Sequence, residues 1–165
     1  MDTGETNPTP AAAVALVSEL APGILQDLLA PYGLTLDWRA AGAEIPGSYW
    51  QAPEAGLIEN RLVLRPDTPV HSALHEACHF ICADSVRRAS LHTDAGSGDL
   101  EECGVCYLQC LLADALPGYS RHRMWADMDA WGYSFRLGSA RAWFENDAED
   151  ARQWLKQRGL LPPAS

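Results

Sequence analysis

The stretch His71-Ser-Ala-Leu-His75-Glu76-Ala-Cys-His79-Phe-Ile-Cys-Ala83 decides how this chain is interpreted. His75 and His79 are one helical turn apart, so that both imidazoles project from one helix face and can bind the same metal ion. Glu76 stands beside them, where a carboxylate can orient or deprotonate a metal-bound water. The segment therefore contains the HExxH pattern.

The surroundings of this pattern predict that its helix is buried. The neighbouring side chains are apolar nearly all round the helix, namely Ala73, Leu74, Ala77, Phe80, Ile81 and Ala83. Two histidines and a glutamate are costly to bury without a partner, and a bound cation would be that partner. The alternative is a chance match, with two hydrogen-bonded core histidines and a glutamate that reaches solvent. We predict His75 and His79 as metal ligands and Glu76 as the catalytic residue.

A third protein ligand is expected from the helix that begins near Asp99. Asp99 suits the N-cap position, and Glu102 follows it at capping-box spacing, which gives Glu102 a structural role at the surface. Glu101 instead shares a helix face with small and apolar residues that should pack against the histidine helix, including Gly104, Val105 and Leu108. We predict Glu101 as the third ligand, with Glu102 as the alternative.

Four other residues are weaker candidates for the site: His71, His92, Asp94 and His122. His92 and Asp94 lie in a polar, glycine-rich stretch that is typical of a surface loop. From such a loop they could reach a metal-bound substrate or hold a ligand imidazole. None of the four is predicted as a metal ligand.

The five cysteines all lie between Cys78 and Cys110, unlike a disulfide framework spread along a secreted chain. A four-thiolate zinc site from Cys78, Cys82, Cys103 and Cys106 is disfavoured, because both pairs lie in predicted helices rather than in turns. We expect reduced, buried thiols between packed helices. The start of the chain lacks the positively charged segment of a secretory signal, so we expect a cytoplasmic protein.

Length and periodicity predict one α+β domain, mainly helical with a small sheet. Residues 1–11 are predicted as a flexible arm and 12–165 as a single metal-binding domain, with the site between the HExxH helix and the following glutamate-bearing helix. Strands are expected at 34–38 and 61–64, with a loop at 42–56 between them. The expected helices cover 12–30 (two short helices, or one kinked helix), 70–86, 99–116, 121–131, 139–146 and 147–157. Aromatic residues on the last three helices are expected in the core.

Composition disfavours two classes of partner. Acidic residues outnumber basic ones 22 to 12, and the net charge of −10 opposes binding to nucleic acid. No apolar run approaches the roughly 18 residues that a membrane-spanning helix needs. We therefore expect neither a nucleic acid nor a membrane as partner.

A family resemblance adds to this interpretation. The run Asn60-Arg-Leu-Val-Leu64, then Ser72-Ala-Leu-His-Glu76, His79-Phe80, Ala83 and Arg87-Arg88, resembles the elongation factor P hydroxylase family of bacteria in order and spacing. The likeness covers about forty residues, from Tyr49 to Arg88. It implies an intracellular protein whose non-haem iron, held by His75, His79 and a glutamate of the second helix, hydroxylates a modified lysine of a translation factor. A looser resemblance, to small zinc metallopeptidases, rests on HExxH and a downstream glutamate.

Three functions are compatible with these residues. Two histidines and a carboxylate form the facial triad of non-haem iron oxygenases, and the same three ligands can hold zinc. We favour a hydroxylase with one Fe(II) ion, because the resemblance to the elongation factor P hydroxylase family covers the longer stretch. The alternative is a Zn(II) peptidase or hydrolase with Glu76 as general base. The third is a noncatalytic binding module with a structural ion, which would need a fourth ligand such as His92 or a cysteine.

Overall fold

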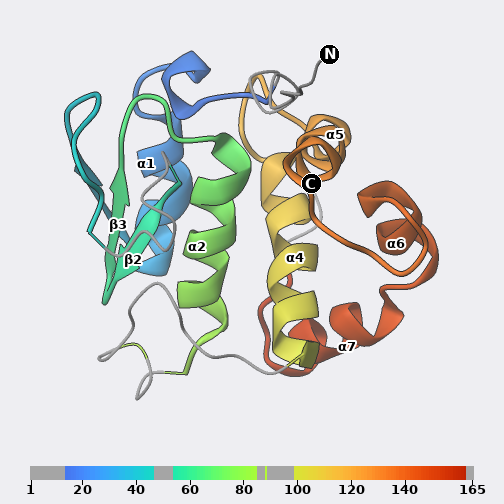
Figure 1. The fold of residues 1–165 in the computed structure, drawn as a ribbon. Coiled ribbons are helices and arrows are strands. Elements are labelled where there is room, and N and C mark those ends of the chain that lie inside the picture. The colour runs from blue at the N-terminus through green and yellow to red at the C-terminus, as the bar shows by residue number, and fades with distance from the viewer. Residues whose placement is uncertain (1–13, 47–53, 85–87, 89–98, 163–165) are drawn as a thin grey trace, which may run out of the picture.

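The protein, seen here as a computed structural model, is described over residues 14–46, 54–84, 88 and 99–162 (Figure 1). Most of these residues are helical, and a small sheet lies at one side of the helices. This is the predicted α+β arrangement. The predicted arm at 1–11 lies outside the described residues.

The sheet contains three short strands: β1 (Thr35–Trp38), β2 (Gly56–Ile58) and β3 (Arg61–Leu64). The strand order is β1-β3-β2, with β1 parallel and β2 antiparallel to β3. The central strand is covered on both faces, since Leu62, Val63 and Leu64 are fully buried. The strands expected at 34–38 and 61–64 are confirmed. β2 was not predicted, because its three residues begin with glycine and are too few to show a period of two.

Short helices precede the sheet. A 3-10 helix covers Val17–Glu19, α1 covers Ile24–Leu29, and a second 3-10 turn covers Ala30–Tyr32. The chain enters α1 through Gly23, whose φ of 85° lies in the left-handed region that glycine adopts without strain. The second of the predicted short helices is thus confirmed as α1, whereas the first is a single 3-10 turn.

Helix α2 (Val70–Cys82) carries the HExxH pattern and lies between the sheet and helix α4 (Figure 1). Every residue of α2 is buried except His75 and Glu76, which are partly buried, so the prediction of a buried helix is confirmed. The expected end near residue 86 is wrong. The backbone turns extended at Ala83, and the Arg88 guanidinium donates to the carbonyls of Phe80 and Ile81, at 3.0 and 3.1 Å.

The remaining helices lie on the other side of α2: α4 (Asp99–Ala113), α5 (Arg121–Trp131), α6 (Ala140–Asn146) and α7 (Glu149–Gln157). Their positions agree with the predicted segments to within three residues at each end. α4 contacts α2 on one side and α7 on the other. Gly104 allows the second contact, because a Cβ atom there would lie 2.7 Å from Cε3 of Trp154.

The aromatic residues of the C-terminal helices do form core, as expected. Trp125, Trp143 and Trp154 are buried in the hydrophobic cluster, and Phe144 packs against it. Trp131 differs, because its ring lies 5.0 Å from that of His71 on α2. None of the helices in the described ranges combines the length and apolar character that crossing a bilayer requires.

Candidate metal centre

Helix α2 places the two histidines of the motif against each other. The rings of His75 and His79 meet edge to face, with centroids 4.8 Å apart. Both Nε2 atoms point to α4, where each lies close to an oxygen of Glu102. The helical spacing therefore brings both imidazoles to one face of α2, as the HExxH pattern predicts.

Glu102 completes the cluster from α4. Its Oε2 lies 3.2 Å from Nε2 of His75, and its Oε1 lies 3.1 Å from Nε2 of His79. One donor atom from each residue lies within 4.8 Å of the others. Nitrogen and oxygen ligands about 2.0–2.2 Å from a tetrahedral ion are roughly 3.4 Å from one another. The three side chains could therefore hold one divalent ion.

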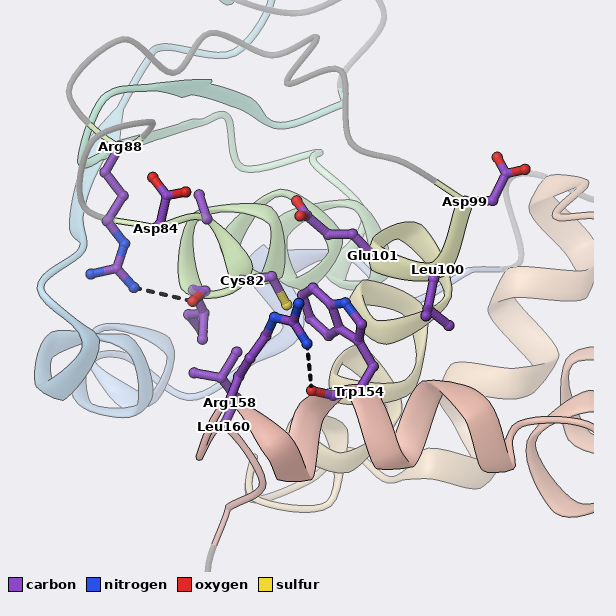
Figure 2. A pocket seen from close by; sticks show the side chains of 11 residues that line it. Cys82, Asp84, Arg88, Asp99, Leu100, Glu101, Trp154, Arg158 and Leu160 are labelled. Carbon is purple, nitrogen blue, oxygen red and sulfur yellow. Dashed lines mark hydrogen bonds between the residues drawn. The ribbon is translucent and has the colours of Figure 1, made fainter.

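The structure brings Glu102, the alternative in the prediction, to the two histidines in place of Glu101, the predicted third ligand. Asp99 is the first residue of α4 rather than its N-cap, and both carboxylate oxygens of Glu102 face the histidines. Glu102 lies on the helix face that includes Cys106 and Gln109, toward the histidines. Glu101 lies on the adjoining face and lines a pocket of about 770 Å³ with Trp154 and Arg158 (Figure 2).

The pKa values of His75 and Glu102 are shifted in opposite directions by their mutual contact. Burial alone would lower the pKa of His75, but Tyr133, Cys106 and Glu102 together raise it well above its ordinary value. Burial of Glu102 opposes ionisation, yet hydrogen bonds from His75 and His79 hold its pKa well below the usual range. The imidazole of His75 and the carboxylate of Glu102 thus favour each other's charged forms, and a metal ion could take the place of a proton between them.

The opening to solvent is on the Glu102 side. The side chain of Glu102 is 44% exposed, whereas that of His79 is 9% exposed. An ion held by three protein ligands would keep a coordination position for water or substrate.

Glu76 and Glu54 bring two more carboxylates to this region. Oε1 of Glu76 is buried without a hydrogen-bond partner among the described residues, and burial raises the pKa of the side chain against the pull of His75 and His79. Burial also raises the pKa of Glu54, which accepts a hydrogen bond from Trp131 and feels the charge of His75. Glu54 was not predicted as a site residue, because the sequence around it shows no motif with the spacing of metal ligands.

His71 belongs to the wall of the site and not to the cluster. Burial, with a smaller effect of His75, lowers its pKa to about 3, so the ring is neutral. Its Nδ1 lies 3.1 Å from the Tyr133 hydroxyl. His122 packs on Trp125 at 5.1 Å, on α5. The other weak candidates, His92 and Asp94, lie outside the described residues.

The cysteines do not join the metal cluster. All five are free thiols; four are buried and Cys103 is partly buried. Among the described residues, the group with metal-ligand spacing consists of His75, His79 and Glu102. The expectation of buried thiols between packed helices is confirmed, and Cys106 contacts His75 from the α4 side.

Comparisons of the chain with protein-family models, with curated proteins and with solved structures found no match. The fold and the site therefore define the class: an α+β domain with a His/His/Glu cluster that could hold a metal ion.

Proposed function

We propose that this protein is a mononuclear metal enzyme that holds one divalent ion through His75, His79 and Glu102. The observation that carries the proposal is the convergence of these three side chains from two helices at ligand spacing. The exposure of Glu102 supports catalysis over a purely structural ion, because a structural site is closed by a fourth protein ligand. The described residues supply three.

The first reaction class that we propose is hydroxylation with non-haem Fe(II). Two histidines and one carboxylate are the ligand set of such oxygenases, and bound iron would supply the activation of dioxygen. The resemblance to the elongation factor P hydroxylase family over Tyr49 to Arg88 supports this class and suggests a protein substrate such as a translation factor. In this reaction the protein fixes the ligand geometry, while Glu76 and Glu54 set the polarity beside it.

A second reaction class, hydrolysis with Zn(II), is favoured by Glu76. Its carboxylate lies beside both histidines on α2, has a raised pKa and leaves one buried oxygen without a partner among the described residues. A carboxylate tuned in this way suits a general base that takes a proton from a water molecule. The bound zinc would polarise the scissile carbonyl.

Anaerobic purification followed by elemental analysis separates the two classes. We expect about one iron per chain and an activity that requires dioxygen. In that case Glu76→Gln should keep its iron and retain hydroxylation to within about tenfold, the smaller effect of a supporting residue. Zinc in the chain, with oxygen-independent hydrolysis that Glu76→Gln lowers by at least about a hundredfold, would establish the second class instead. A wild-type chain that binds neither ion would overturn the proposal.

A further inference from the structure

Gln109 joins the candidate metal centre to the helix behind it. The residue is fully buried on α4, two turns after Glu102. Its Oε1 lies 2.9 Å from Nδ1 of His75, and its Nε2 donates to the backbone carbonyl of His71 at 2.9 Å. The side-chain amide thus spans one turn of α2, beside the face that presents His75 to the metal position.

The hydrogen bonds fix which way the amide points. A backbone carbonyl can only accept, so the Gln109 nitrogen must face His71 and its oxygen must face His75. The oxygen in turn can only accept, so Nδ1 of His75 must carry a proton. The lone pair of the neutral ring is then on Nε2, the atom that faces Glu102.

Tyr133 and Met124 hold the amide from its other side. Nε2 of Gln109 lies 3.4 Å from the Tyr133 hydroxyl and 3.5 Å from the Met124 sulfur. The hydroxyl also lies 3.1 Å from Nδ1 of His71, to which it can donate. The ring of Tyr133 packs edge to face on His75, at 5.8 Å. Rotation of the amide would break these contacts together, so its orientation is well determined.

We propose that Gln109 is a positioning residue that fixes the tautomer and the ring orientation of His75 for metal binding. The inference rests on the proposed function, since it assigns Gln109 a role toward the same ion. Groups that accept a hydrogen bond from the remote nitrogen of a ligating histidine typically contribute about 10–100-fold to metal affinity. Gln109 is an uncharged acceptor, so it orients His75 without adding a further negative charge to a buried cluster that already holds Glu102 and Glu76.

The test uses the full chain and Zn(II) as the probe. Zinc affinity is measured by competition with a chromogenic chelator for the wild type, Gln109→Leu and Gln109→Glu. The matched control is Gln153→Leu on α7, where the glutamine is partly exposed. We expect Gln109→Leu to bind zinc about 10–100-fold more weakly. Gln109→Glu keeps the acceptor oxygen and should recover most of that loss. The control should bind like the wild type.

A nitrogen-15 NMR spectrum of the histidines measures the protonation of each ring nitrogen. This property should not change if Gln109 has a purely structural role. In the zinc-loaded wild type, His75 should bind zinc through Nε2 and show an Nδ1 proton protected from solvent exchange; in Gln109→Leu that protection should be lost. Zinc binding through Nδ1, or equal zinc affinity of folded wild type and Gln109→Leu, would overturn the inference. If Gln109→Leu does not fold, the wild-type spectrum and the affinity of Gln109→Glu decide the question. A wild type that binds no zinc and no iron would instead overturn the proposed function.

Discussion

Replacing Glu102 with glutamine tests the central feature of the site. The substitution keeps the size of the side chain but removes the charge that faces His75 and His79 at 3.2 and 3.1 Å. An amide is a poor ligand for a divalent ion beside two neutral imidazoles, because it cannot offset the charge of the cation. We therefore expect Glu102→Gln to fold and to lose most of its metal affinity.

The size of the effect can be worked out for zinc. At a free zinc concentration about 100 times the dissociation constant, binding stabilises the folded state by about 2.7 kcal/mol. Each kcal/mol corresponds to about 2–4 °C of melting temperature at this chain length, so the wild type should gain about 5–11 °C. Loss of a supporting residue costs about 10–100-fold in affinity, and loss of a ligand at least the upper figure. Glu102→Gln should then gain only about 0.4 kcal/mol, or about 1–2 °C.

Differential scanning calorimetry with and without zinc measures these shifts, each variant being compared with its own metal-free form. Glu101→Gln is the matched control, because it removes the same charge one residue away in the same helical turn. It should keep the wild-type shift. The assignment of Glu102 would be refuted if zinc raised the melting temperature of Glu102→Gln as much as that of the wild type, but did not raise that of Glu101→Gln. Glu101 would then be the third ligand.

Two further outcomes follow from the packing around the site. His79→Ala should abolish stoichiometric metal in elemental analysis, because two remaining ligands compete poorly with buffer; full occupancy would contradict the assignment. Gly104→Ala places a Cβ atom 2.7 Å from the Trp154 ring. Overpacking costs about 1–3 kcal/mol against a gain of up to about 1 kcal/mol in helix propensity, so urea unfolding should show a net loss of about 1 kcal/mol. An unchanged unfolding midpoint would show that α7 moves aside freely.

Much of the fold was predictable because its signals are local. The period of apolar residues in α2 and the position of His75 and His79 within it depend on neighbours in sequence alone. The same holds for α5, whose predicted bounds agree with the structure. The end of α2 was harder to predict, because carbonyls of its last turn accept hydrogen bonds from Arg88, seven and eight residues further along the chain.

The parts of the site that sequence reasoning missed depend on contacts between elements. Gln109 looks like an ordinary polar residue of an amphipathic helix, and only the packing of α4 on α2 brings it to His75. A usable signal was present, since Gln109 is two turns from Glu102 and therefore shares its face. Glu54 offers no such spacing, and its place in the structure is marked by the hydrogen bond that it accepts from Trp131.

The choice between Glu101 and Glu102 shows why an acidic helix start is ambiguous. Asp99, Glu101 and Glu102 all lie in the first turn of α4, where carboxylates stabilise the helix dipole by about 0.3–1 kcal/mol each. An acidic first turn suits helix initiation and metal binding equally. Consecutive side chains on a helix point in directions that differ by about 100° around the helix axis. A shift of one residue in the predicted start therefore exchanges the two glutamates. Both glutamine variants lose the same interaction with the dipole, so a difference between their zinc shifts reports the ligand and not the stability of the helix.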